Sequence, residues 1–235
     1  MKTEVKLVIS NPIPCTCEED YSHLGIEVSL VEGKLAALKT VVEHDIGAGH
    51  ADIISKARSA TASLLSLIEL GHGCPANIEE VHTHAVEPAS EVSIGLGFVK
   101  VAATLVRQIP MPPANLVANL GESTRLQLNW YLHGQNGSSA IERIKNYYNV
   151  LEEEKRLTKK SATPYEPPAD ARFLRNAVSH PDLNDPKVVD YLQKNLGASK
   201  IDPKNEAHIR FLEGQVLFLQ SEAQRVLDGK VPKWW

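Results

Sequence analysis

Pro110-Met111-Pro112-Pro113 divides this chain of 235 residues into two parts with different hydrophobic patterns. Proline fixes φ and has no backbone N–H, so three prolines within four residues interrupt both strands and helices. Upstream of this segment, strand-like runs surround one clear helical pattern, whereas downstream the apolar residues repeat mostly at helical spacing. We therefore predict a first domain over residues 1–112 and a second over residues 113–235.

The first domain is expected to be a small, mainly antiparallel sheet with one packed helix. Apolar residues in Ala51–Leu70 lie on one helical face, and Gly71 is expected to end that helix. Leu35–Val42 is largely apolar and is left open between strand and helix. Strands are predicted over Glu4–Ser10, which ends at Asn11-Pro12, and over Gly25–Val31, Glu79–Val86 and Glu91–Ala102.

The second domain is expected to be an all-helical bundle with short loops marked by proline and glycine. Ser139 and Glu142 form a capping box at the start of one helix, which continues to Lys160. The other helices are predicted over Thr124–His133, ended by Gly134; from Asp170 to Ser179; from Asp185-Pro186 to Gly197; and from Asp202-Pro203 onward. The fold class is therefore α+β, with a sheet domain followed by a helical bundle.

Composition excludes several classes of protein. Hydrophobic residues make up 43% and charged residues 23%, which is typical of globular domains and excludes a disordered or fibrous chain. No apolar run approaches the length of a membrane span, and the opening MKTEVKLVISNP is unlike a signal peptide, so we expect a cytoplasmic protein. The net charge of −4 argues against tight non-specific binding to nucleic acid, although residues 121–235 carry an excess of basic side chains.

Three cysteines argue against a disulfide framework. Together Cys15, Cys17, His72 and Cys74 contain the donor types of a four-ligand zinc site, but the C-x-C and H-x-C spacings are tighter than those of common zinc knuckles. We interpret the cysteines as reduced thiols near turns, and we predict no metal ion and no cofactor.

Residues 173–181, FLRNAVSHP, contain the most informative group of polar side chains in the chain. Asn176 and His180 are four residues apart and so share a side of the predicted helix, whereas Arg175 lies about 140° from His180 on an ideal helix. Pro181 disfavours helical geometry in the preceding residue, so the helix should end near His180. The pattern therefore places an imidazole at a helix end, close to a guanidinium and an amide.

Arg175-Asn176-Ala177-Val178-Ser179-His180 resembles the Arg-x-x-x-x-His motif of HEPN domains, in which a polar residue commonly follows the arginine. Asn129-Trp130-Tyr131 and the tyrosine pair within Ile141–Glu152 are similar to the first helices of the ApeA-like branch of bacterial HEPN proteins. In that branch a small mixed domain often precedes the bundle. The resemblance covers roughly residues 121–228.

This resemblance implies a metal-independent endoribonuclease of the toxin or defence type, in which two chains pair so that both motifs line one cleft. His180 would move the proton of the ribose 2′-hydroxyl or of the leaving oxygen, because histidine titrates near neutral pH. Arg175 would hold the scissile phosphate, and Asn176 would orient the phosphate or the imidazole. The expected product carries a 2′,3′-cyclic phosphate.

Secondary contacts to RNA are predicted at five basic residues: Lys155, Arg156, Lys159, Lys160 and Arg172. The expected partners are RNA, a second copy of the chain bound through the bundle, and an antitoxin or another protein, with no membrane. Two alternatives stay open: a non-catalytic dimeric interaction or sensor protein, and a nucleotide-binding accessory subunit. For Arg175 and His180 themselves a structural role also stays open, with Arg175 paired to an acid of another helix and His180 capping its own helix.

Overall fold

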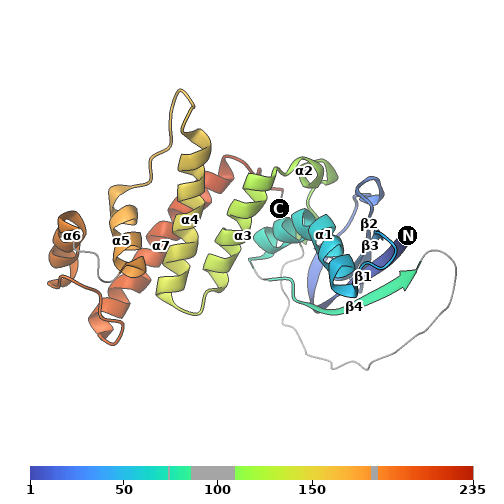
Figure 1. Ribbon diagram of the computed structural model, residues 1–235, viewed down its shortest axis with the longest axis horizontal. Helices are drawn as coiled ribbons and strands as arrows, with labels where there is room; N and C mark the ends of the chain where they lie inside the picture. The colour runs from blue at the N-terminus through green and yellow to red at the C-terminus, as the bar shows by residue number, and fades with distance from the viewer. Residues whose placement is uncertain (74, 86–108, 181–184, 235) are drawn as a thin grey trace. The chain divides into compact units, whose positions relative to one another are not determined.

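The computed structural model describes residues 1–73, 75–85, 109–180 and 185–234, and the chain divides into two compact units (Figure 1). The first unit contains Met1–Leu120 with Trp234, and the second contains Gly121–Lys233. The division follows Leu120, whereas the sequence places it at the proline segment. The difference arises because a short helix, α2 (Ala114–Asn119), packs against α1 (His50–His72) of the first unit.

The first unit is built on an antiparallel sheet with the strand order β2-β3-β1-β4. A short strand, β5, pairs in parallel with the end of β1. The predicted architecture of a mainly antiparallel sheet with a packed helix is confirmed, while the strand expected over Glu91–Ala102 lies outside the described residues. The strands are β1 (Lys2–Thr16), β2 (Ile26–Val31), β3 (Lys34–Glu43), β4 (Ile78–Ala85) and β5 (Ile109–Pro110), with a 3-10 turn at Ser22–Leu24.

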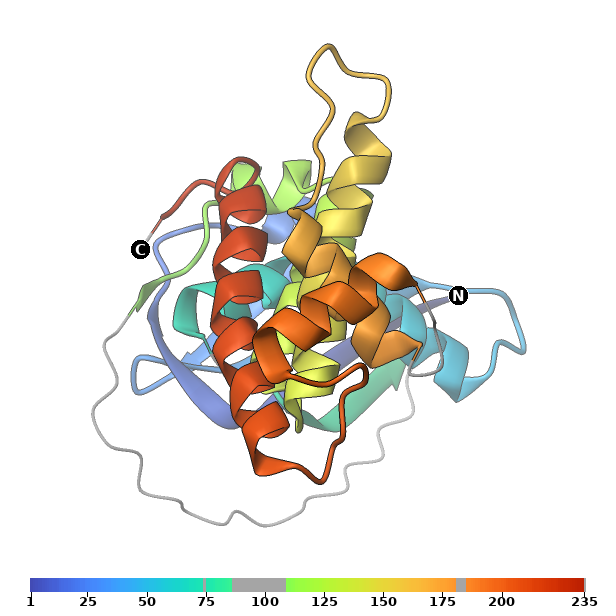
Figure 2. The same ribbon diagram turned by 90° about the vertical axis from the view of Figure 1, so that its left-hand side faces the viewer.

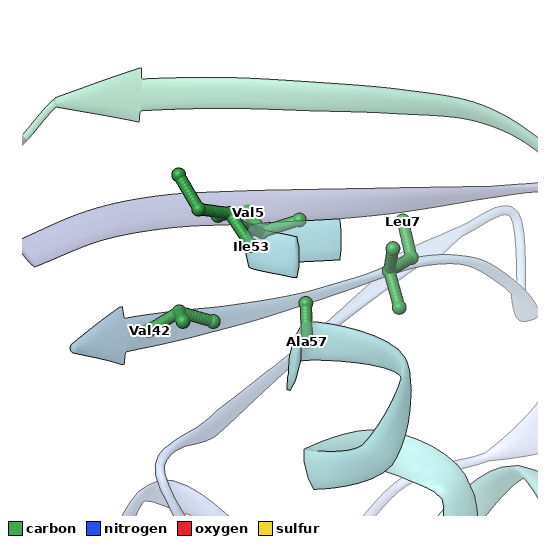
Figure 3. Close-up of a cluster of buried hydrophobic side chains, with 5 residues drawn as sticks. All are labelled: Val5, Leu7, Val42, Ile53 and Ala57. Atoms are coloured by element: carbon green, nitrogen blue, oxygen red, sulfur yellow. The ribbon is translucent and has the colours of Figure 1, made fainter. Parts of the chain in front are cut away.

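Helix α1 covers one face of this sheet. Val5 and Leu7 of β1 and Val42 of β3 point toward Ile53 and Ala57 of α1, and all five side chains are buried (Figure 3). Alternate residues of a strand share a face, so the alternation in β1 directs its apolar side chains into this core. The Leu35–Val42 segment, which the sequence left undecided, is a strand. It belongs to β3, which pairs with β1 along one edge and with β2 along the other.

Strand β1 is longer than the sequence predicts. It was expected to end at Asn11-Pro12, yet it runs to Thr16 after a register shift between Val8 and Ile13. Proline cannot donate to the hydrogen-bond ladder, so the strand passes this point as an irregularity and resumes its pairing beyond it.

The described part of the second unit contains five helices, which confirms the expected helical region (Figures 1 and 2). They are α3 (Glu122–Asn136), α4 (Ala140–Thr158), α5 (Ala169–Ser179), α6 (Pro186–Leu196) and α7 (Glu206–Asp228). Helix α4 contacts α3, α5 and α7, and α6 packs on α5. Ile144 and Leu151 of α4 and Leu174 of α5 are completely or almost completely buried, so the core lies along α4. No helix within the described residues combines the length and the apolar character needed to cross a membrane.

Several predicted helix ends are confirmed. The Ser139 hydroxyl accepts a hydrogen bond from the Glu142 N–H at 3.2 Å, as a capping box requires. Asp185 caps α6 ahead of Pro186, and Gly197 ends that helix with a φ of 63°. Local capping chemistry therefore determines these boundaries without help from distant residues.

Four other predicted ends are wrong. Helix α1 continues through Gly71 to His72, and Gly73 is its C-cap. Helix α5 is preceded by Pro168, so Asp170 lies within its first turn. There its negative charge interacts favourably with the helix dipole. Helix α7 begins after Asn205 rather than at Asp202-Pro203, because the Asn205 Oδ1 accepts the Ala207 N–H at 2.9 Å. Helix α3 continues through Gly134 to Asn136.

Gly134 lies inside α3, at a position where the helix packs closely against α4. A Cβ atom at this residue would lie 2.6 Å from Cε1 of Tyr147, whose side chain is completely buried on α4. Only glycine lets the two helices approach so closely at this point, and the helix continues with ordinary geometry on either side.

Candidate functional site

Helix α5 separates an apolar face from a polar one. Leu174, Ala177 and Val178 are buried as the sequence predicts, and Ala171 joins them. On the other side Arg175 and Asn176 are half-buried, and His180 is exposed just beyond the last helical residue. The same amphipathic pattern that anchors α5 to the bundle therefore presents these three polar side chains to solvent.

The guanidinium of Arg175 brings the three predicted site residues together. Its Nη1 lies 3.3 Å from Asn176 Oδ1 and 3.4 Å from His180 Nε2, so one group donates to both neighbours. On an ideal helix Arg175 and His180 would point apart. They meet because His180 leaves helical geometry, with φ −133° and ψ 73°, while its N–H still donates to the Asn176 carbonyl at 2.9 Å.

The hydrogen bond between Arg175 and His180 depends on the tautomer of the imidazole. An arginine N–H donates to Nε2 of His180 only when that nitrogen carries a lone pair, which places the ring proton on Nδ1. A protonated ring would lose this acceptor and bring two cations together. In that tautomer Nε2 is the acceptor that faces the arginine.

The ring of Tyr148, on α4, packs against the guanidinium group of Arg175. The guanidinium carbon lies 5.7 Å from the centre of the Tyr148 ring, and the tyrosine is 6% exposed. Within the described residues Arg175 forms no ion pair with a carboxylate. The alternative role, in which Arg175 pairs with an acid of another helix, therefore has no partner in this part of the chain.

Tyr148 is the residue of this site that the sequence did not reveal. The Tyr147-Tyr148 pair is interpreted from the sequence as core or interface, and both side chains are buried, with the Tyr147 ring packed 5.5 Å from that of Tyr131. Burial raises the pKa of Tyr148, as does Glu152, whereas Arg175 and Arg172 act in the opposite direction. No local sequence signal assigns an aromatic ring to an arginine on another helix, so only the packing of α4 against α5 identifies it.

Two of the five predicted RNA-contacting residues form ion pairs with glutamates. Lys155 pairs with Glu166 at 2.6 Å, and Arg156 forms a two-point ion pair with Glu153 at 2.6 and 2.7 Å. Lys159 and Lys160 are exposed at the end of α4. Arg172 is exposed on α5, and its guanidinium carbon lies 5.5 Å from the centre of the Phe173 ring.

We expect the Glu153–Arg156 pair to stabilise the fold in a pH-dependent way. Hydrogen bonds from Arg156 hold the pKa of Glu153 below its usual range, against the effect of partial burial. Because the native pKa is the lower one, this stabilisation is present above the unfolded-state pKa, about 4.3, and is lost as the pH falls through the native value. Glu153→Gln should lower the melting temperature at pH 7 more than at pH 3.

Glu206→Gln is the matched control, because Glu206 forms an ion pair with Arg210 in which both side chains are more than four-fifths exposed. Its melting temperature should stay close to that of the wild type at both pH values. An equal loss of stability for Glu153→Gln at pH 7 and pH 3 would show that the charge of Glu153 is not what stabilises the fold.

No group of three or more histidine, cysteine or acidic side chains that could hold a metal ion occurs among the described residues. Burial raises the pKa of Cys15 to about 11, so this thiol stays protonated at neutral pH. Cys17 donates a hydrogen bond to the Glu19 carbonyl at 3.4 Å. Cys74, the other thiol of the zinc alternative, lies outside the described residues.

Comparison of the chain with protein-family models, with curated proteins and with solved structures finds no match. The functional argument therefore rests on the geometry of the site itself.

Proposed function

We propose that the second unit is a metal-independent endoribonuclease of the HEPN type, acting in the cytoplasm in toxin or defence systems. The observation that carries the proposal is the contact among Arg175, Asn176 and His180 at an accessible helix end. A guanidinium without a carboxylate partner binds phosphate well, and a neutral imidazole beside it accepts a proton. These are the two groups that transesterification of RNA requires.

Substrate binding releases the base in this mechanism. A phosphate oxygen is a stronger acceptor for the Arg175 N–H groups than the long 3.4 Å contact to His180, so the phosphate replaces the imidazole as their partner. Nε2 is then free to take the proton of the ribose 2′-hydroxyl. The 2′-oxygen forms a bond to phosphorus, the bond from phosphorus to the 5′-oxygen breaks, and that oxygen leaves with a proton.

Asn176 acts on the arginine in this arrangement. Its Oδ1 accepts from Arg175 Nη1, and its backbone carbonyl accepts the His180 N–H, so one residue connects the other two. We further propose, from the resemblance to HEPN domains, that two copies of the bundle pair and that the motif of each copy lines a shared cleft. In that cleft the second imidazole is placed to protonate the leaving oxygen.

The products of the reaction test the proposed chemistry. Purified protein should cleave a mixed RNA substrate in EDTA and leave 2′,3′-cyclic phosphate ends, because the nucleophile belongs to the substrate and the charge is offset by arginine. Mass spectrometry of the fragments identifies the ends. Cleavage that requires a divalent cation, or that leaves 3′-hydroxyl ends, would exclude this mechanism. A folded protein that cleaves no RNA would favour the alternative of a non-catalytic interaction module.

Replacement of Tyr148 should weaken the site through Arg175. Tyr148→Leu removes the ring beneath the guanidinium, so we expect about a tenfold loss of cleavage rate, whereas Tyr148→Phe keeps the ring and most of the rate. Nitrogen-15 NMR of the Arg175 Nε–H group provides a second measurement, since its ring-current shift should persist in Tyr148→Phe and vanish in Tyr148→Leu. Tyr147→Phe is the control, and equal rates for both Tyr148 variants would contradict a positioning role for the ring.

A further inference from the structure

We propose that Arg172 binds a second phosphate beside the one held by Arg175, so that the substrate is an RNA strand with at least two consecutive phosphates. This inference rests on the proposed function and adds the class of substrate that the site selects. It follows from three features of the two arginines: they lie on the same face of α5, each contacts an aromatic ring, and neither forms an ion pair within the described residues.

Arg172 and Arg175 lie on the same polar face of α5. Residues three apart on a helix differ by about 60° in direction and by about 4.5 Å along the axis. Their guanidinium groups are therefore neighbours along the helix, and Arg172 lies toward the amino-terminal end, where the helix dipole also favours an anion. A strand that places one phosphate on Arg175 can place the adjacent phosphate within reach of Arg172.

Both arginines rest on aromatic rings, and within the described residues neither forms an ion pair. The guanidinium carbons lie 5.5 Å from the Phe173 ring centre and 5.7 Å from that of Tyr148. An aromatic face supports the flat side of a guanidinium and leaves its N–H groups at the edge, available to an anion. Four other arginines of the second unit pair instead with glutamates: Arg143 with Glu213, Arg156 with Glu153, Arg210 with Glu206 and Arg225 with Glu222.

Both guanidinium groups act electrostatically on Tyr148 of α4. The charges of Arg175 and Arg172 both act to lower the pKa of the Tyr148 hydroxyl, against the larger effect of burial. Two carboxylates share this neighbourhood, Glu152 and Glu166, and the second of these is held by Lys155 at 2.6 Å. Lys155 therefore offsets the charge of Glu166, while the two arginines have no carboxylate partner among the described residues.

Short oligonucleotides with a blocked 2′-position test this inference without requiring cleavage. Fluorescence anisotropy would compare a labelled 2′-O-methyl dinucleotide, which has one phosphate, with the trinucleotide, which has two. Wild-type protein should bind the trinucleotide about tenfold more tightly, because a second charge-assisted contact forms. In Arg172→Gln this advantage should disappear, and the slope of log K against log salt for the trinucleotide should fall by about 0.7.

Arg210→Gln is the matched control, since Arg210 is an exposed arginine paired with Glu206 on a different helix. It should keep the full preference for the trinucleotide. Equal affinity of the wild type for both oligonucleotides, or an unchanged preference in Arg172→Gln, would overturn the inference. Because these ligands cannot be cleaved, binding decides the role of Arg172 even if the cleavage assay shows that the proposed ribonuclease activity is wrong.

Discussion

His180→Ala should reduce RNA cleavage by about a thousandfold while the fold stays intact. His180 is the proposed acceptor of the 2′-hydroxyl proton, and a positioned acid or base contributes roughly 10² to 10⁴ in rate. The side chain is exposed and lies beyond the end of α5, so its truncation leaves the core unchanged. Arg175→Ala should cause a loss of similar size, since a group that stabilises transition-state charge contributes about 10² to 10³.

Matched variants separate these losses from general damage. His133→Ala removes another exposed histidine, on α3, and should leave cleavage at the wild-type rate. Arg175→Lys keeps the charge but loses the planar fork that reaches Asn176 and a phosphate together, so we expect it to recover only part of the rate. Wild-type rates in His180→Ala, with a folded protein, would contradict the proposed base. Single-turnover rates, with circular dichroism as a check of folding, provide both measurements.

Gly134→Val should destabilise the second unit by about 3 kcal/mol. The Cβ would lie 2.6 Å from a ring carbon of Tyr147, and the two further carbons of valine would enter the same contact. Tyr147 is completely buried against Tyr131, so its ring has little room to move away. Helix propensity alone predicts a small gain in stability, because valine is a better helix former than glycine. The steric clash with Tyr147 should cost more than this gain.

Gly214→Val is the matched control for this change. Gly214 lies within α7, and no atom comes within 4 Å of the position that its Cβ would occupy. The same substitution there should change the free energy of unfolding by no more than about 0.5 kcal/mol, in the stabilising direction. Urea unfolding of both variants gives the comparison. Equal stability of the two variants would mean that Gly134 is not a close-packing position.

Local signals in the sequence predict the helices whose ends depend on neighbouring residues. The Ser139 cap and the Asp185-Pro186 start are confirmed because a few adjacent atoms determine them. The apolar face of α5 is confirmed for a similar reason, since its period follows from helix geometry alone. Fold class follows from these patterns and from the alternation in β1.

The predictions that fail depend on distant residues. Gly134 has the usual appearance of a helix end, and only the ring of Tyr147 explains why α3 continues through it. Similarly, Pro12 is a common strand breaker, yet β1 resumes because β3 and β5 supply partners for its second half. Sequence reasoning near one residue cannot include contacts that only the folded chain makes.

The residues of the candidate site are a prediction from the sequence, whereas the contacts among them come from the structure. The motif places Arg175, Asn176 and His180 on one helix, and ideal helical angles would separate the arginine from the histidine. The departure of His180 from helical φ and ψ brings them into contact, and Tyr148 fixes the arginine from another helix. The first feature is local to the end of α5 and the second is tertiary, and both bear directly on the proposed chemistry.

The most direct test of the account is cleavage, in EDTA, of an oligonucleotide with a single ribose 2′-hydroxyl in an otherwise 2′-O-methyl strand. The account predicts one cut, immediately 3′ of that ribose, with a 2′,3′-cyclic phosphate end, and no cut when the ribose is replaced by deoxyribose. The same cut should be lost in both Arg175→Ala and His180→Ala. Cleavage that persists without the 2′-hydroxyl, or in either variant at the wild-type rate, would contradict the proposed ribonuclease site.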